Sequence, residues 1–351
     1  MPLSLRRAFA LVLLAPLALA AQRPTTAADV KRILYPLADD SMAGRMTGSP
    51  GEAMAARFIA AEMQRIGLKP MGDSGFYQRV PVAAVPLAQP SRNGRTERLT
   101  LLKSIADRDT FPAERRRPSV NVLGAIEGSD PALKNEVVLV DAHFDHLGVG
   151  RAINGDSIYN GADDDASGTT AVLEIARQLA AGPKPKRTVI FATNTGEEVG
   201  LFGTRWFIDH PPIPLTQFVA NMEIEMIGRP DSLAGGSGKA WLTGFERSNM
   251  GEQLAAAGIP IVADKRPDQH FFERSDNIAF ARRGIVAHTL STFNLHTDYH
   301  QPSDDVKDVD LEHMAGVINA AARAVRVLAN GPKPEWKPGG QPVAPAPRPA
   351  P

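Results

Sequence analysis

The segment NGADDDASGTT, residues 160–170, places three aspartates side by side between two glycines. One carboxylate at the start of a helix has an ordinary capping role, because free N–H groups and the helix dipole stabilise it there. Three adjacent carboxylates exceed that role and repel one another. A divalent cation would remove the repulsion, since carboxylate oxygens bind zinc and one carboxylate can bridge two ions. Asp163, Asp164 and Asp165 therefore indicate a metal site.

A second group of candidate ligands lies in the sequence DAHFDH, residues 141–146. On a strand, His143 and Asp145 would point to the same face. A carboxylate beside an imidazole holds a metal-binding histidine in one tautomer and one orientation. A histidine at the end of a strand can equally be structural, and His146 is interpreted as structural because the sequence offers it no partner.

Two adjacent glutamates, Glu197 and Glu198, follow the apolar run TVIFATN. Neighbouring side chains at the end of a strand point in different directions. One glutamate can therefore bind a metal while the other faces the water that a hydrolysis must activate. The alternative is an exposed acidic turn with no chemistry.

A histidine pair, His296 and His300, lies in the segment LHTDYHQPSDD. The spacing is that of zinc peptidases whose two histidines lie on one helix, but Thr297 stands where that motif has its catalytic glutamate. Gln301 and Pro302 also favour a loop, so the helical motif is excluded. A serine nucleophile is not indicated either, because Ser167 lies in DASGT rather than in a G-x-S-x-G turn.

Apolar segments with strand and helix character alternate along the chain, which argues for an α/β fold with a mostly parallel sheet covered by helices on both faces. Such sheets bind ligands beyond the carboxyl ends of their strands. His143, Glu197 and Glu225 each lie near that end of a candidate strand. The predicted strands are Asn135–Phe144, Arg187–Glu198 and Phe218–Gly228, and the predicted helices are Gly51–Leu68, Gly168–Gly182, Gly251–Gly258 and Leu311–Gly331.

The composition is that of a globular protein, with 43% of the 351 residues hydrophobic and 22% charged. Lys and Arg together number 39, as do Asp and Glu, and no long basic run suggests a nucleic-acid surface. We therefore expect no nucleic-acid partner. The chain has no cysteine, so it must be held by its core rather than by disulfides.

The N-terminus has the pattern of a secretory signal peptide over residues 1–20. Arg6 and Arg7 precede an apolar run that is too short to span a bilayer, and Ala18-Leu19-Ala20 follows as a small-x-small cleavage pattern. We expect an exported protein, periplasmic or secreted, with no stable membrane insertion after cleavage. An uncleaved anchor helix is the alternative.

The C-terminal segment, residues 331–351, is Pro-rich and lacks an apolar period, so it is expected to be a disordered tail. Residues 21–330 would then form a single domain. The oligomeric state cannot be read from the sequence.

Five segments, AHFDHLG, GADDDASG, EEVG, NMEIEMIGR and DYHQPSDD, follow one another in a characteristic order. In that order and spacing the chain resembles the co-catalytic zinc peptidases typified by bacterial leucyl aminopeptidases, metallopeptidase family twenty-eight. The resemblance covers about Leu34 to Ala329, and the early LADDSMAGRMTGSPGE is similar to exported bacterial members. It implies the zinc-peptidase fold, two Zn²⁺ per chain and a peptide substrate.

The resemblance also implies how the ions are held. One zinc would be bound by Glu198 and His300, the other by His143 and Glu225, and Asp164 would bridge the two. Glu225 stands where the leucyl aminopeptidases have aspartate, so its longer side chain can shift or weaken that zinc. A cis peptide bond between Asp164 and Asp165 is a further expectation.

The remaining roles follow from the same resemblance. Glu197 would be the general base, Asp145 would orient His143, and Tyr299 matches a position whose hydroxyl can stabilise an oxyanion. Packing is the alternative for Tyr299. The segment FFERSDN resembles the neighbourhood of the family's substrate pocket. Candidate substrate-binding residues are Arg274, Ser275, Asp276 and His296.

The expected activity is that of an aminopeptidase releasing N-terminal residues from peptides. A carboxypeptidase, a dipeptidase or a glutaminyl cyclase on the same fold is the alternative within this enzyme class. A non-catalytic binding module is the alternative outside it, but none of the inferred ligand positions holds an inert residue.

Overall fold

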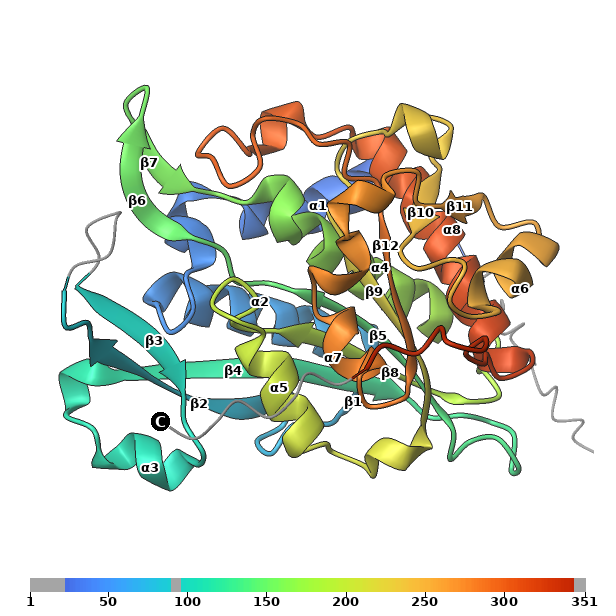
Figure 1. Ribbon diagram of the computed structural model, residues 1–351, viewed down its shortest axis with the longest axis horizontal. Helices are drawn as coiled ribbons and strands as arrows, with labels where there is room; N and C mark the ends of the chain where they lie inside the picture. Colours follow the sequence, from blue (N-terminus) through green and yellow to red (C-terminus); the bar gives the residue numbers. More distant parts are fainter. Residues whose placement is uncertain (1–22, 90–95, 344–351) are drawn as a thin grey trace, which may run out of the picture.

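The computed structural model describes residues 23–89 and 96–343 (Figure 1). The predicted signal peptide, residues 1–20, and the last part of the predicted tail, residues 344–351, lie outside the described residues. Within the described part of the chain, no helix is both long enough and apolar enough to cross a membrane.

A mixed sheet of ten strands runs through the molecule. In order across the sheet, the strands are β11 (Ile261–Ala263), β10 (Ala240–Leu242), β12 (Val286–Ser291), β9 (Phe218–Glu225), β5 (Val137–His143), β8 (Thr188–Asn194), β4 (Arg116–Ile126), β2 (Tyr77–Pro86) and β3 (Glu97–Leu101), with β1 (Lys69–Pro70) paired to β4. The central strands β12, β9, β5 and β8 are parallel to their neighbours in this group. Both flanks contain antiparallel pairs, β10 with β12 on one side and β8 with β4 on the other.

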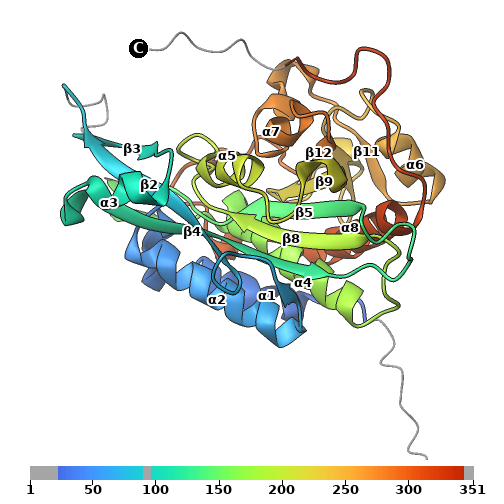
Figure 2. The ribbon, with the colours of Figure 1, turned by 90° about the horizontal axis from the view of Figure 1, so that it is seen from below.

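Helices cover both faces of the sheet, as predicted (Figure 2). The parallel strands are accordingly buried, and every residue of β5 is buried. One face is covered by α1 (Ala27–Leu37), α2 (Pro50–Ile66), α4 (Gly168–Ala180) and α8 (Leu311–Asn330), and the other by α5 (Phe202–Asp209) and α7 (Asn277–Ala281). The remaining helices are α3 (Ile105–Thr110) and α6 (Met250–Ala256), and β6 (Gly148–Ile153) and β7 (Asp156–Tyr159) form a separate hairpin.

Alternate residues of the central strands feed two separate cores. On β5, Val138 and Val140 belong to the large core under α4 and α8, whereas Val137 and Leu139 belong to the smaller core under α5 and α7. This alternation follows from the period of two along a strand. It leaves the strand ends, where the apolar pattern stops, as the places for polar side chains.

The predicted helices form close to the expected boundaries. The helix predicted over Gly51–Leu68 is α2, which begins after Ser49 because the Ser49 side chain accepts a hydrogen bond from the Glu52 N–H. It ends at Gly67, whose φ of 85° is a left-handed conformation that glycine adopts without strain. The strands β2, β4 and β12, the short edge strands, and the helices α1, α3, α5 and α7 were not predicted.

The segment that follows α8 differs from the predicted tail, because residues 331–343 pack on the domain. The Trp336 indole N–H donates to the Gly284 carbonyl at 3.0 Å, and the Lys337 N–H donates to the Arg247 carbonyl at 2.9 Å. The Trp336 ring also lies beside those of Phe272 and His288. A single large ring thus anchors a stretch whose overall composition favours disorder.

Candidate metal centre

The candidate site lies at the carboxyl ends of the parallel strands. Strand β5 ends at His143 and β9 ends at Glu225, while Glu197 and Glu198 follow shortly after the end of β8. Because these strands are parallel neighbours, their ends meet at one edge of the sheet. The structure thereby brings together polar residues that are separated by more than eighty positions in the sequence.

Asp164 lies at the centre of this group, in the turn Ala162–Ser167 that leads into α4. Its two carboxylate oxygens face different imidazoles. Oδ1 is 3.2 Å from Nε2 of His143, and Oδ2 is 3.1 Å from Nε2 of His300. The peptide bond between Asp164 and Asp165 is cis, as expected. A carboxylate oriented in this way can serve two cations at once.

Two groups of side chains could each hold a metal ion, and Asp164 belongs to both. One group is His143, Asp164 and Glu225, and the other is His146, Asp164 and Glu198. His300 adjoins the second group, since its Nε2 is 3.2 Å from Oε2 of Glu198. All five ligand positions expected from the sequence therefore lie at this one site.

His146 was interpreted from the sequence as structural, but it lies in the site. Its Nδ1 is 2.7 Å from Oε1 of Glu198 and 3.9 Å from Oδ2 of Asp164, and its side chain is fully buried. No aligned hydrogen bond from the described residues reaches either ring nitrogen, or Oε1 of Glu198. The only available signal was its place three residues after His143 in the same short segment.

The residues fit zinc. Zn–N and Zn–O bonds of about 2.0–2.2 Å place two ligand atoms of a tetrahedral site about 3.3 Å apart. The ring-nitrogen to carboxylate distances of 3.1–3.2 Å made by His143 and His300 match that separation. The unsatisfied buried atoms of His146 and Glu198 are also what a site designed for an ion would leave.

The excess of acidic side chains at this site also favours bound cations. Burial raises the pKa of the Glu225 carboxyl well above its ordinary value, and nearby Glu223 and Asp164 add to the effect against the opposing influence of His143. Burial and the charge of Asp164 raise the pKa of the Glu198 carboxyl, but the nearby imidazoles of His146 and His300 outweigh both and hold that pKa at about 2. A site this crowded with acids needs cations to keep its carboxylates ionised.

Asp145 links two functional residues. Its backbone carbonyl is 3.1 Å from Nδ1 of His143, and its carboxylate Oδ1 is 3.7 Å from the same nitrogen. Oδ1 also accepts the Glu197 N–H at 3.1 Å, while Oδ2 accepts the Thr47 hydroxyl at 2.8 Å. Asp145 can therefore orient His143, as expected, and it fixes the turn that carries Glu197 as well.

Glu197 is surrounded by charge. Burial raises the pKa of its carboxyl well above the ordinary value, and the carboxylates of Glu225 and Glu198 raise it further, while His143 opposes them. A carboxyl with a raised pKa holds a proton more readily than an ordinary one, which suits a group that must accept a proton and return it.

Arg45 is a supporting residue that the sequence did not reveal as such. Its buried guanidinium donates to the carbonyl oxygens of Leu37, Phe144, Asn160 and Gly161 at 2.6–2.9 Å. Phe144 follows His143, and Gly161 opens the aspartate turn. Arg45 therefore ties the N-terminal segment to both loops that carry ligands. Its only signal was membership of the segment LADDSMAGRMTGSPGE.

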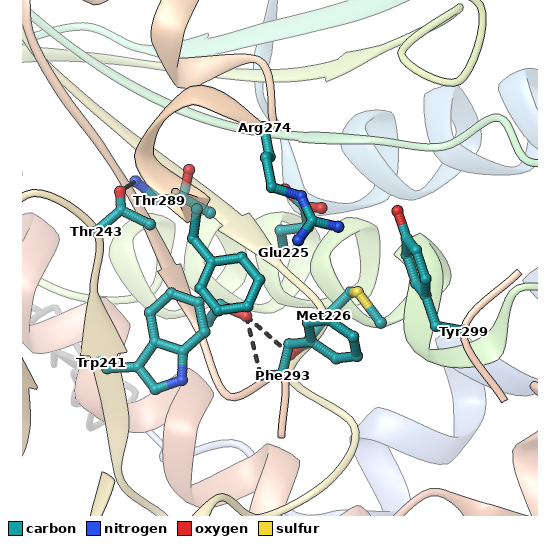
Figure 3. Close-up of a pocket in the computed structure, with 10 residues that line it drawn as sticks. Glu225, Met226, Trp241, Thr243, Arg274, Thr289, Phe293 and Tyr299 are labelled. Atoms are coloured by element: carbon teal, nitrogen blue, oxygen red, sulfur yellow. Dashed lines mark hydrogen bonds between the residues drawn. The ribbon is translucent and has the colours of Figure 1, made fainter. Parts of the chain in front are cut away.

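A pocket opens beside the ligand group and contains Arg274 and Tyr299 (Figure 3). It is bordered by Glu225. The Tyr299 ring stacks on that of His300 with centroids 3.9 Å apart, and burial raises the pKa of its hydroxyl. The other lining residues are Met226, Trp241, Thr243, Phe271, Thr289, Ser291 and Phe293.

The other three predicted substrate-binding residues do not line this pocket as the described residues form it. Ser275 is buried and donates to Oε1 of Glu223 at 2.5 Å. Asp276 is buried and accepts a 3.3 Å hydrogen bond from Asn194. His296 lies against Asp163, with Nε2 2.9 Å from Oδ2. Of the four candidate substrate-binding residues, Arg274 is the one that lines the pocket.

Paired metal groups that share one carboxylate, next to a glutamate and a pocket, suit a metallopeptidase. Residues 121–325, more than half of the chain, match the model of Peptidase family M28. The chain belongs to that family.

Solved structures show the same fold. A zinc aminopeptidase from Bacillus subtilis is 15% identical, with a TM-score of 0.61 over 88% of this chain and 96% of the other. A glutaminyl cyclase from Porphyromonas gingivalis is 14% identical, with a TM-score of 0.57 over 86% of this chain and 97% of the other.

The curated relatives are much longer than this chain. The vacuolar membrane protease of Candida tropicalis is 24% identical over 210 residues, which is 60% of this chain and 21% of the relative. The chain thus spans about a fifth of the length of the curated relatives it matches.

Proposed function

We propose that this protein is a di-zinc aminopeptidase that hydrolyses the first peptide bond of its substrates. The observation that carries the proposal is the orientation of Asp164, whose two oxygens face His143 and His300 on opposite sides. A carboxylate shared in this way suits two ions rather than one. His143 and Glu225 would hold one zinc, and Glu198 and His300 the other, with His146 as a further candidate ligand or support on the Glu198 side.

When bound, the two zinc ions would activate a water and polarise the scissile carbonyl. Glu197 accepts the proton of that water and returns it to the leaving amine, a role for which its raised pKa is suited. Asp145 holds both residues in place: its carboxylate accepts the Glu197 N–H, and its backbone carbonyl contacts the His143 ring. The Tyr299 hydroxyl borders the pocket, where it can donate to the oxyanion that forms on the substrate.

The test combines metal analysis with blocked and free substrates. Purified protein should contain close to two zinc ions per chain, and chelation should abolish hydrolysis, with zinc restoring it. Substrates with a free amino terminus should be cleaved and their N-acetylated counterparts should not. Full activity of the metal-free protein, or preference for acetylated peptides, would refute the proposal.

A glutaminyl cyclase is the alternative to test in parallel, because one solved structure with this fold carries that activity. One zinc per chain, with release of ammonia from peptides that begin with glutamine, would favour the cyclase over the aminopeptidase.

We also propose that the protein is exported, on the basis of residues 1–20 alone. The mature chain should then begin at or just after residue 21. N-terminal sequencing of protein recovered from outside the cytoplasm would test this.

A further inference from the structure

The pocket beside Glu225 has aromatic walls. Trp241 and Phe271 are stacked with centroids 5.1 Å apart, and the rings of Phe293 and Tyr299 are 5.3 Å apart. Walls of this kind hold the apolar part of a ligand, while a few polar groups decide its orientation and identity. The question is which polar groups of this pocket remain free to meet a ligand.

The three serine and threonine hydroxyls in the lining are already engaged within the protein. The Thr243 hydroxyl oxygen accepts the Thr289 N–H at 2.9 Å, and the Thr289 hydroxyl donates to Glu223 at 2.7 Å. The Ser291 hydroxyl donates to the Met226 carbonyl at 3.2 Å. These groups support the walls of the pocket, so they contribute little to choosing between ligands.

Arg274 is different, because its guanidinium points into the pocket with its donors unused (Figure 3). Its central carbon is 5.1 Å from the ring centroid of Phe271 and 6.0 Å from that of Tyr299. Within residues 23–89 and 96–343, no ion pair or side-chain hydrogen bond occupies the guanidinium. A guanidinium is always charged, and its planar array of donors matches a carboxylate.

The backbone segment after Arg274 is held in place by hydrogen bonds to Glu223. Glu223 accepts hydrogen bonds from the hydroxyl of Ser275 at 2.5 Å and from the N–H groups of Asp276 and Asn277 at 3.0 Å. Glu223 lies on β9 two residues before Glu225, so one strand anchors both the arginine loop and a candidate zinc ligand. Arg274 is therefore held at a fixed place relative to the metal centre, as a specificity determinant requires.

We propose that Arg274 binds a carboxylate of the substrate in this pocket. The inference rests on the proposed exopeptidase function and adds the chemical class that the pocket selects. Two sources share this chemistry: the side chain of an N-terminal aspartate or glutamate, and the terminal carboxylate of a short peptide. The aromatic walls would hold the methylenes beside it, and substrates with a basic side chain in the pocket would be repelled.

The first experiment compares substrates that differ by one charge. Zinc-loaded enzyme is assayed with the p-nitroanilides of glutamate and glutamine linked through the α-carboxyl, and with leucylglycine and leucylglycine amide. Preference for glutamate over glutamine identifies the side-chain carboxylate. Preference for leucylglycine over its amide identifies the terminal carboxylate.

Arg274→Gln supplies the test of the residue. Hydrogen bonds to a charged group imply that this variant loses about tenfold to a hundredfold in kcat/KM on the preferred acidic substrate. Its activity on the neutral partner should change less than about threefold, and Arg274→Lys should recover part of the loss. The matched control is Arg247→Gln, whose guanidinium also stacks on a phenylalanine, Phe272 at 4.5 Å, but lies outside the pocket.

A binding measurement separates this inference from the proposed function. Calorimetry with free glutamate, glutamine, leucylglycine and its amide on the zinc-loaded protein reports on Arg274 even if no substrate is hydrolysed. Selective binding of the acidic member that Arg274→Gln abolishes, with no hydrolysis of any substrate, would support the inference and refute only the exopeptidase activity. Equal binding and hydrolysis of acidic and neutral partners, or an equal loss on both in Arg274→Gln, would overturn it.

Discussion

Nδ1 of His146 lies 2.7 Å from Oε1 of Glu198, and both side chains are almost fully buried. The contact is not aligned as a hydrogen bond, and Nε2 of His146 has no partner among the described residues either. We therefore infer that the imidazole belongs to the metal centre rather than to the core. It either binds an ion directly or supports the Glu198 carboxylate that would bind one.

We predict that His146→Gln weakens binding of one of the two proposed zinc ions. Loss of a group that ligates or supports a ligand typically costs about tenfold to a hundredfold in metal affinity. Titration of the metal-free protein with zinc against a competing chelator would measure both sites. His288→Gln is a control, because His288 is a buried histidine that belongs to neither ligand group. Unchanged binding of both ions by His146→Gln would contradict the prediction.

Glu197→Gln should separate chemistry from metal binding. Glutamine keeps the shape of the side chain but cannot take a proton, so kcat should fall by about a hundredfold to ten-thousandfold. Zinc content should stay at the wild-type value, because Glu198 rather than Glu197 belongs to the ligand groups. Glu198→Gln serves as the contrast and should lose metal. A Glu197→Gln protein that retains full activity would exclude the residue as the base.

The adjacent aspartates should respond differently to the same substitution. Asp164→Asn removes a ligand common to both groups, so it should abolish metal binding and activity together. Asp163 instead accepts hydrogen bonds from the Gly228 N–H at 2.6 Å and from the Ser167 hydroxyl. Asp163→Asn should cost about 1–3 kcal/mol in the free energy of unfolding and keep bound zinc. Urea denaturation and metal analysis of both variants would check this, and equal loss of zinc would contradict it.

Acid should destabilise the protein partly through His288. Burial lowers the pKa of this imidazole to about 4, whereas an unfolded chain gives it a value of about 6.5. Between these values the unfolded state binds more protons, so the free energy of unfolding falls as pH drops from about 6.5 to about 4. The full effect is on the order of 3 kcal/mol.

His288→Asn should therefore lose less stability than the wild type between pH 7 and pH 4.5. Urea midpoints of the metal-free proteins at the two pH values give the comparison, with the exposed His210→Asn as control. An identical pH dependence in wild type and His288→Asn would rule out this contribution.

The sequence was sufficient for three of the central strands, β9, β5 and β8, and for placing the expected ligand residues at their ends. The strands that end at His143 and Glu225 are continuous apolar runs, and a parallel sheet necessarily gathers the ends of such runs. The aspartate triplet and the glutamate pair could be recognised as candidate metal ligands because adjacent carboxylates repel one another unless a cation lies between them.

What the sequence could not reveal depends on contacts between distant segments. Arg45 acts through four carbonyl oxygens, and backbone acceptors leave no trace in residue types. His146 offered no partner within its own segment, since Glu198 is supplied by another strand end. Ser275 and Asp276 lie beside Arg274 in the sequence, but the turn they occupy buries both side chains and exposes only the arginine.

Because Trp336 packs on the domain, the folded part of the chain extends beyond Gly331. The Trp336 ring lies 6.4 Å from that of Phe272, and the neighbouring Phe271 is a wall of the pocket that carries Arg274. Shortening the protein at Gly331 would remove Trp336 and uncover Phe272, the residue next to that wall. Substrate preference could then drift although every residue of the metal centre remained in place, so recombinant versions should keep the chain at least through Lys337.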